Sequence, residues 1–365
     1  MSGSGPTPPD EALDPAAFER AFRTLADAPG PVLAAVSGGP DSTALMYALA
    51  AWRRPGRPRV TVATVDHGVR PDSRAEAEAV GEAARALGLD HALLLWRERP
   101  AGRFSQAAAR RARYDLLAGF ARGVGATHLA TAHTLDDQAE TLLMRLAAGS
   151  GPAGLAGMRA ATRRGDLVHV RPFLRVTKAA LLATCRARHW AYLEDPSNAD
   201  PRFARVRWRR LAPLLAAEGF APDRLARLAD RLARAEDALA RVAEGALAAS
   251  RRSGPSGALT LDGGRLAAEP DEIALRVLAL ALAESGAEEG AIRLGRLESC
   301  LAVCLGALRD GAAARRTLAG RLVSVAADGR ILIEAEPARR GGRTSSVTEI
   351  AAGAPHSLGI RGGRA

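Results

Sequence analysis

Short apolar runs and amphipathic stretches alternate along residues 31–133, and this alternation is the feature that most limits the fold. The apolar runs are PVLAAVSGG, RVTVATVDHG, HALLLW and THLATAH, with helix-like segments between them. Strands that are separated by helices at this spacing pair in parallel. The sequence therefore predicts an α/β fold with a doubly wound, mainly parallel sheet, followed by a mainly helical domain and a short C-terminal hairpin.

Three polar segments directly follow predicted strands. They are residues 37–42 (SGGPDS), residues 66–68 (DHG) and residues 133–138 (HTLDDQ). In a doubly wound sheet, ligands bind in the crevice at the carboxyl ends of the strands. We therefore expect these three segments to converge on one site.

The chain divides into four expected parts. Residues 1–28 form a leader, rich in Gly, Pro and Ser at its start and partly disordered, with helical spacing over residues 15–25. Residues 29–211 form the α/β domain, and residues 212–316 have the periodicity of packed helices. Residues 317–365 contain a hairpin around Asp328 and Gly329, whose pairing is a strong two-residue turn signal, and then a loose tail.

The chain is strongly basic, with a formal net charge of +11 at pH 7, and Lys178 is its only lysine. This charge favours a nucleic-acid partner, but a biased genome is an equally good explanation of so much arginine. The three cysteines, Cys185, Cys300 and Cys304, cannot form a disulfide framework, which indicates a reducing compartment. There is no signal peptide and no apolar stretch of membrane-helix length, so we expect a cytoplasmic protein with no membrane association.

The hexapeptide SGGPDS lies between a predicted strand and a predicted helix. Backbone N–H groups and the helix dipole favour an anion at such a place, and glycines allow phosphates to approach closely. The segment lacks the Lys-Ser/Thr ending of a Walker motif and the three-glycine spacing of a dinucleotide fold. A tight turn with Asp41 as a helix cap is the structural alternative.

The hexapeptide resembles the PP-loop of the ATP pyrophosphatase superfamily, whose fold is adenine nucleotide alpha hydrolase-like. The resemblance implies that ATP is cleaved between its α and β phosphates. It also implies ATP binding by Ser37, Gly38, Gly39, Pro40, Asp41 and Ser42. We expect Asp66 to contact the nucleotide as well, although a role in a turn is nearly as well supported.

Further motifs, in order and at the right spacing, are similar to those of the tRNA(Ile)-lysidine synthetase family over residues 30–215. They are residues 65–70 (VDHGVR), 109–114 (ARRARY), 132–141 (AHTLDDQAET), 149–158 (GSGPAGLAGM), 171–178 (RPFLRVTK) and 194–198 (EDPSN). The resemblance implies that ATP adenylates C2 of the first anticodon cytidine of an isoleucine tRNA with a CAU anticodon. The ε-amine of free L-lysine then displaces AMP to form lysidine, which switches codon reading from AUG to AUA.

The residue types suit this reaction. Release of pyrophosphate needs charge neutralisation, for which we expect Mg²⁺ on Asp41 and Asp137. The lysine ammonium must lose a proton before attack, and His133 or Asp137 is the expected acceptor. The expected catalytic residues are thus Asp41, His133, Asp136 and Asp137. The alternatives are a hydrogen-bonded histidine at a strand end and two aspartates that only cap the following helix.

Residues 202–210 (RFARVRWRR) contain five arginines, two aromatics and no acid. Guanidinium groups pair with phosphates and aromatic rings stack on bases. The expected tRNA or phosphate contacts are Arg113, Arg205, Arg207 and Arg209, with an exposed basic helix face as the alternative. Two departures from the family pattern, Val206 for asparagine and Ala148 for arginine, put single contacts in doubt.

A PP-loop tRNA thiolation enzyme is the main alternative function. Sulfur transfer normally needs reactive cysteines, and residues 1–184 contain none. An amidotransferase-type synthetase would need a glutaminase domain with a catalytic cysteine near its start, and none is present. A non-enzymatic RNA-binding protein is disfavoured because the whole PP-loop is retained. The sequence leaves open whether the chain forms a homodimer.

Overall fold

The structure is a computed structural model, and it describes residues 11–68, 72–97, 106–193, 202, 204–255, 257–287 and 292–337. The chain divides into two compact units, the first ending at Val242 and the second beginning at Ala243. Among the described residues, no helix is both long and apolar enough to cross a membrane.

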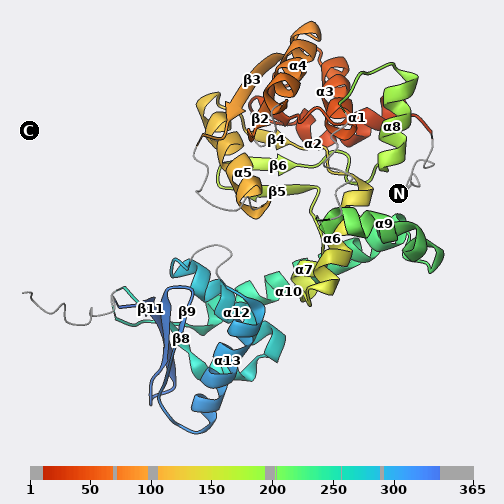
Figure 1. Cartoon of the computed structure of the whole chain (residues 1–365). Helices are drawn as coiled ribbons and strands as arrows, with labels where there is room; N and C mark the ends of the chain where they lie inside the picture. The colour runs from red at the N-terminus through yellow and green to blue at the C-terminus, as the bar shows by residue number, and fades with distance from the viewer. Residues whose placement is uncertain are drawn as a thin grey trace, which may run out of the picture. The chain divides into compact units, whose positions relative to one another are not determined.

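The first unit contains a six-stranded sheet, in the order β3-β2-β1-β4-β6-β5 (Figure 1). Its strands are β1 (Val32–Ala35), β2 (Val60–Asp66), β3 (Asp90–Leu95), β4 (His128–Ala130), β5 (Ala161–Arg164) and β6 (Leu167–Val170). Every pair is parallel except β5 with β6. The predicted mainly parallel sheet is thus confirmed, and β1 lies between β2 and β4.

Ten helices of the described chain belong wholly or partly to this unit. They are α1 (Pro15–Ala21), α2 (Arg23–Ala26), α3 (Pro40–Trp52), α4 (Ser73–Ala86), α5 (Gln106–Gly123), α6 (Leu135–Ala147), α7 (Pro152–Leu155), α8 (Lys178–Ala187), α9 (Ala204–Ala217) and α10 (Pro222–Ser250), which continues into the second unit.

Strand β1 is buried on both faces, which explains its uninterrupted apolar sequence. Val32 and Ala34 pack in a cluster that also holds residues of α3 and α8. The alternate residues, Leu33 and Ala35, pack in a second cluster with Leu117 of α5. Because helices cover both faces, only the ends of the sheet are open to a ligand.

The N-terminal segment is integrated into the α/β core from residue 11 onward. Phe22 and Leu25 are fully buried, and the Phe22 ring lies 5.6 Å from the Trp52 ring of α3. The Leu13 N–H donates to Thr184 Oγ1 of α8 at 2.8 Å. The helical spacing predicted for residues 15–25 is confirmed, as two short helices that meet at Phe22.

Helices α6, α9 and α10 pack together within the first unit. Ala139 and Leu142 of α6 form a buried cluster with Leu225 and Ala229 of α10, and α6 also contacts α9. The segment from residue 204 to residue 242 is therefore structurally continuous with the α/β domain.

The second unit combines the expected helices with a five-stranded antiparallel sheet, in the order β7-β8-β11-β10-β9. Its strands are β7 (Arg251–Arg252), β8 (Leu259–Asp262), β9 (Ala314–Leu318), β10 (Arg321–Val325) and β11 (Arg330–Ala335). Its helices are α11 (Gly263–Ala268), α12 (Asp271–Glu284) and α13 (Leu294–Arg309).

The predicted hairpin is confirmed as β10 and β11, but its turn is longer than the two residues expected. The Ala326 N–H donates to the Arg330 carbonyl at 2.8 Å and the Gly329 N–H to the Ala326 carbonyl at 2.9 Å, so residues 327–329 form a three-residue connection. Gly329 adopts a left-handed φ of 79°, as the residue after a type I turn commonly does. The sequence analysis did not anticipate β7, β8 and β9, which complete the sheet around this hairpin.

Candidate active site

The PP-loop connects β1 to α3 and is held by its own side chains. Ser42 Oγ accepts from the Ser37 N–H at 3.1 Å and donates to the Gly39 carbonyl at 3.0 Å. Thr43 Oγ1 donates to the Gly38 carbonyl at 3.0 Å. These bonds fix the loop in one shape without a ligand, which lowers the entropic cost of binding one.

Glycine is required at Gly38 for two reasons. Its φ is 90°, and a Cβ at this position would lie 2.8 Å from Leu193 Cδ1. Gly39 differs, since no described atom lies within 4 Å of a Cβ built there. Gly39 is also the N-cap of α3, and Pro40 begins that helix. The open side of the loop thus presents a helix N-terminus to an anion.

Asp66 ends β2 beside this loop, and the structure shows it in a turn. Its Oδ1 accepts from the Gly68 N–H at 2.7 Å and from Ser73 Oγ at 2.8 Å. The carboxylate therefore organises the connection between β2 and α4. A nucleotide contact by Asp66 stays a prediction, and residues 69 and 70 of the same motif lie outside the described residues.

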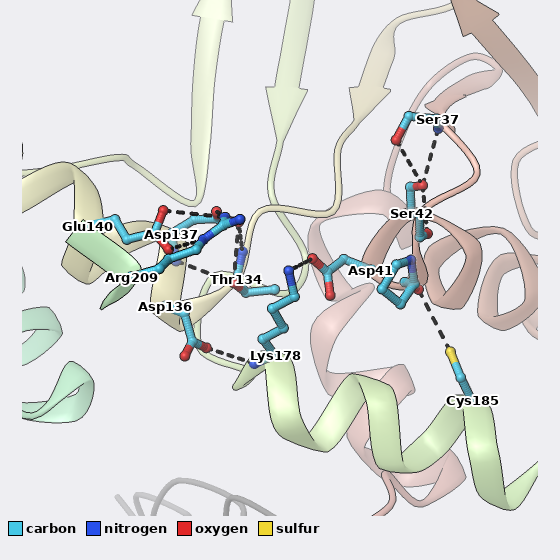
Figure 2. Close-up of polar contacts among 12 residues, drawn as sticks. Ser37, Asp41, Ser42, Thr134, Asp136, Asp137, Glu140, Lys178, Cys185 and Arg209 are labelled. Carbon is cyan, nitrogen blue, oxygen red and sulfur yellow. Dashed lines mark hydrogen bonds and ion pairs between the residues drawn. The ribbon is translucent and has the colours of Figure 1, made fainter. Parts of the chain in front are cut away.

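Asp41 faces the only lysine of the chain across the site (Figure 2). Lys178 Nζ lies 3.6 Å from Asp41 Oδ2, while the buried Oδ1 has no hydrogen-bond partner in the described part of the chain. Burial raises the pKa of Asp41 to about 6; Lys178 opposes this shift and the Asp137 charge adds to it. A cation that contacts the Asp41 carboxylate more closely than Lys178 does would therefore stabilise its ionised form.

Asp137 caps the start of α6, and Asp136 binds the backbone at the start of α8. Asp137 Oδ2 accepts from the Thr134 N–H at 2.9 Å, and Thr134 Oγ1 accepts from the Asp137 N–H, which completes a capping box. Asp136 Oδ2 accepts from the Lys178 N–H at 2.7 Å and so ties the start of α8 to α6. Capping by Asp137 is thus observed, and Figure 2 shows the Asp137 carboxylate facing Arg209 and the Asp136 carboxylate at the backbone of Lys178, whose ammonium group faces Asp41.

Arg209 of α9 lies between two carboxylates of α6 (Figure 2). Its Nε donates to Glu140 Oε1 at 2.6 Å, and its Nη2 lies 3.7 Å from Asp137 Oδ1. Burial raises the pKa of Glu140, and the hydrogen bond from Arg209 opposes that shift. Glu140 and Lys178 were not among the expected site residues, although both lie inside the motifs that carry the family resemblance. That Lys178 is the only lysine of the chain was a usable signal.

His133 follows β4 and is half-buried. Its Nδ1 is 2.8 Å from Thr131 Oγ1, and burial lowers its pKa to about 4. The histidine is therefore neutral at physiological pH, and it lies with the expected aspartates in the crevice at the carboxyl ends of β1 and β4.

The expected arginine contacts lie in different surroundings. Arg113 of α5 is half-buried and has no hydrogen bond or ion pair among the described residues, whereas Arg110 and Arg164 both stack on the Tyr114 ring, each 5.2 Å from its centroid.

On α9, Arg207 Nη1 donates to the Arg202 carbonyl at 3.0 Å, and Arg209 belongs to the carboxylate cluster described above. Val206 is only 6% exposed, so the residue that replaces asparagine points into the protein interior. Phe203 and residues 194–198 lie outside the described residues.

The carboxylates fit Mg²⁺ in a limited sense. No group of three or more metal-ligating side chains occurs in the part of the chain that the structure describes. Mg²⁺ at phosphate-transfer sites usually takes one or two carboxylates together with substrate phosphates and water. Asp41, with its unpartnered Oδ1, and Asp137 are the side chains that meet this requirement.

The cysteine nearest the PP-loop is chemically inert. Cys185 of α8 is fully buried, and its thiol donates to the Pro40 carbonyl at a distance of 3.7 Å. Burial raises the pKa of this thiol to about 11. Since the thiolate is the reactive form, Cys185 supports the loop from below and does not act as a nucleophile.

The chain is similar to known proteins over most of its length. The family model of the PP-loop domain matches residues 16–215. A tRNA(Ile)-lysidine synthase of Methylobacterium sp. (strain 4-46) is 56% identical over 316 residues, which cover 85% of this chain and 90% of that protein. The same-named proteins of Methylobacterium nodulans and Bradyrhizobium sp. (strain BTAi1) are 53% and 48% identical, over 86% and 90% of this chain and 93% and 97% of theirs.

A solved structure shares the fold at low sequence identity. It is the U34-tRNA thiolase NcsA from Methanococcus maripaludis, with a TM-score of 0.52 and 16% identity over 60% of this chain and 78% of that one. This likeness extends to the fold alone, whereas the sequence relatives match over most of their length. The chain belongs to the tRNA(Ile)-lysidine synthase family.

Proposed function

We propose that the chain uses ATP to ligate free L-lysine to C2 of the first anticodon cytidine of an isoleucine tRNA with a CAU anticodon. The main supporting observation is the cluster of Asp137, Glu140 and Arg209 beside the PP-loop. Two carboxylates and a guanidinium group complement the ammonium and carboxylate groups of an amino acid. Thiolation would instead need a reactive thiol, and Cys185 is buried with a raised pKa.

The PP-loop and Lys178 are suited to bind the phosphates of ATP. Backbone N–H groups at the start of α3 and the Lys178 ammonium would neutralise the departing pyrophosphate. Asp41 and Asp137 would hold Mg²⁺, which supplies further charge neutralisation at the phosphates. When ATP binds, Lys178 would exchange its 3.6 Å contact with Asp41 for a phosphate oxygen.

The reaction divides into two displacements. The cytidine O2 attacks the α phosphorus and pyrophosphate leaves, which turns O2 into part of a good leaving group. The lysine ε-nitrogen then attacks C2, the C2–O2 bond breaks and AMP leaves. The ε-ammonium must first lose a proton, and Asp137 and His133 are the candidate acceptors within the site. Asp136 positions Lys178 through its backbone N–H.

Arginines outside the catalytic cluster are proposed to bind tRNA phosphates. Arg113, Arg205 and Arg207 are the candidates in the first unit, and we propose that the helices of residues 212–316 extend the contact. Each phosphate neutralised releases counterions, so binding through these groups should weaken steeply with salt. A homodimer is an additional proposal, which the elution volume of the full chain tests.

Release of AMP and pyrophosphate from labelled ATP tests the proposed function. Turnover should require free lysine and an isoleucine tRNA with a CAU anticodon together, and should stop when the anticodon cytidine is replaced. Asp41→Ala should abolish turnover and leave tRNA retention on a filter unchanged. AMP release that requires tRNA but not lysine would support adenylation by the PP-loop. It would refute lysine as the nucleophile.

A further inference from the structure

A hydrogen-bonded chain of four side chains runs from the sheet interior to the active site. Arg171 Nη2 lies 3.1 Å from His169 Nδ1, and His169 Nε2 lies 2.8 Å from Thr131 Oγ1. Thr131 Oγ1 in turn lies 2.8 Å from His133 Nδ1. Thr131 and Arg171 follow the neighbouring parallel strands β4 and β6 directly, which is why these side chains meet.

The direction of every hydrogen bond in this chain follows from its first member. A guanidinium group only donates, so His169 Nδ1 must accept from Arg171. His169 is fully buried, and burial together with the Arg171 charge lowers its pKa to about 2. Because His169 is neutral and its Nδ1 is an acceptor, its single proton resides on Nε2 and is donated to Thr131.

The same logic continues through Thr131 to His133. Thr131 is 3% exposed, and a buried hydroxyl that cannot donate its proton is costly. Among the described residues, the acceptor within reach of Thr131 Oγ1 is His133 Nδ1. That nitrogen therefore keeps its lone pair for Thr131, and the proton of neutral His133 must reside on Nε2.

His133 Nε2 is the end of the chain that can contact a ligand. It makes no hydrogen bond within the described part of the protein, and it is not among the buried polar atoms that lack a partner. It follows β4 at the edge of the sheet where the PP-loop follows β1. An N–H group without a partner among the described residues therefore lies at the edge of the sheet that the proposed function assigns to ATP and cytidine.

We infer that His133 is a fixed neutral hydrogen-bond donor to a phosphoryl oxygen of the nucleotide, and that Arg171, His169 and Thr131 are positioning residues that set its tautomer. The identity of the ligand in this inference rests on the proposed function. The tautomer of His133 rests on the hydrogen-bonded chain alone. It leaves Asp137 as the acceptor of the lysine proton, because neither nitrogen of His133 has a free lone pair.

The surrounding charges support a neutral donor. After burial, the Asp137 charge is the largest influence and raises the pKa of His133, but the positive charges of Arg171, Arg110 and Arg113 oppose it and the pKa stays lowered. A neutral N–H can stabilise charge that grows on a phosphoryl oxygen without giving up its proton. An imidazolium at this place would add a cation to a site already lined with arginines.

Nitrogen NMR of the full chain labelled with ¹⁵N-histidine tests the tautomer directly. At pH 7.5 the His133 signals, identified by their loss in His133→Gln, should show a protonated Nε2 and an unprotonated Nδ1. Thr131→Ser keeps the hydroxyl and should preserve this pattern, whereas Thr131→Val should yield a mixture of tautomers. An Nδ1-protonated or doubly protonated His133 in the unmodified protein would overturn the inference, whether or not lysine proves to be the substrate.

Thr64→Val is the matched control. Thr64 Oγ1 lies 3.0 Å from His91 Nε2 on the neighbouring strands β2 and β3, so this variant disturbs a second threonine–histidine pair outside the site. It should change the His91 signals and leave those of His133 unaltered.

Single-turnover release of pyrophosphate tests the role of the donor. His133→Gln retains a side-chain N–H, so its rate should stay within about 10-fold of the unmodified rate, while His133→Leu should lose about 100-fold or more. Thr131→Val should lower the rate about 10-fold at every pH between 6.5 and 8.5, without a shifted acid limb. Equal losses in His133→Gln and His133→Leu would show that a side-chain N–H at this position does not assist pyrophosphate release and would overturn the proposed role.

Discussion

At the scale of the residue, the ionised Asp41 carboxylate is electrostatically unfavourable in the folded protein. The carboxylate is largely withdrawn from water, and the nearest cation, Lys178, lies at 3.6 Å rather than at hydrogen-bond distance. Burial outweighs this attraction and raises the pKa to about 6. A metal ion, bound alone or with a phosphate, would therefore stabilise the ionised form of Asp41 more than it would stabilise a carboxylate that is already fully paired.

Asp41→Asn is expected to stabilise the protein while it abolishes pyrophosphate release. The folded-state pKa of Asp41 is raised, so ionised Asp41 destabilises the fold at pH 8, and this penalty fades as the pH falls from 6 to 4. A shift of two units corresponds to about 3 kcal/mol, and this net figure already includes the opposing attraction of Lys178. Urea unfolding should show a gain of about 1–3 kcal/mol at pH 8 and roughly half of it at pH 5.

The control for this prediction is Asp90→Asn, which removes an exposed carboxylate paired with Arg59. Its stability should change by less than about 1 kcal/mol at either pH, as is usual for exposed ion pairs. An Asp41→Asn protein that is less stable than the unmodified chain at pH 8 would show that the ionised Asp41 carboxylate does not destabilise the fold.

Lys178 is expected to be needed for ATP binding. Lys178→Met should weaken ATP binding by about 10- to 100-fold, because a desolvated charge contact contributes about 1.5–3 kcal/mol. Since Lys178 lowers the pKa of Asp41, its removal should also shift the acid limb of the ATP-binding profile to higher pH. Titration of ATP across pH 5–8 checks both effects, with Arg175→Met, at an exposed ion pair, as the control.

At the scale of the element, the start of α6 combines structural and chemical roles. Thr134 and Asp137 cap the helix reciprocally, so the carboxylate that faces Arg209 is held by the same bonds that begin the helix. Asp136 extends this order to α8 through the Lys178 N–H. Capping alone was the structural alternative for these two aspartates, and the structure shows that Asp137 caps α6 while its carboxylate also faces Arg209.

Thr134→Ala is therefore expected to reduce both stability and activity. Loss of an N-cap side chain costs about 1 kcal/mol, and Asp137 would lose both of its hydrogen bonds with the Thr134 hydroxyl. Thr134→Ser should retain both properties. Thermal unfolding together with lysine-dependent AMP release checks the pair, and full activity in Thr134→Ala would show that the capping box does not orient Asp137.

Much of this element-level arrangement was readable from the sequence. The parallel strands were predicted because apolar runs alternate with helix-like segments, and the polar segments after them marked the open edge of the sheet. The contact of Lys178 with Asp41 was not predicted, because it joins segments that are distant in the chain and depends on how α8 packs on α3. The strands β7 (RR) and β9 (ARRTL) were missed because they are arginine-rich and do not alternate, and β8 (LTLD) because its alternating run is only four residues long.

At the scale of the whole molecule, the boundary between the two units lies within α10. The segment of residues 204–242 packs on the α/β domain through Leu225 and Ala229, and Arg159 binds Asp237 across this contact. A chain that ends near Leu211 would therefore lose part of the active-site support. Truncation after Val242 follows the structural division instead.

A chain of residues 1–242 is expected to bind ATP as the full chain does and to bind tRNA more weakly. The PP-loop, Lys178 and the Arg209 cluster all lie within it, whereas arginines of the second unit, such as Arg315 and Arg316, are removed. The logarithm of the tRNA association constant should fall less steeply with the logarithm of salt, by about 0.7–0.9 for each phosphate that the shorter chain no longer neutralises. Unchanged slopes in the two chains would confine the tRNA-binding surface to the first unit, and parallel losses of ATP and tRNA binding would show that the shorter chain is misfolded.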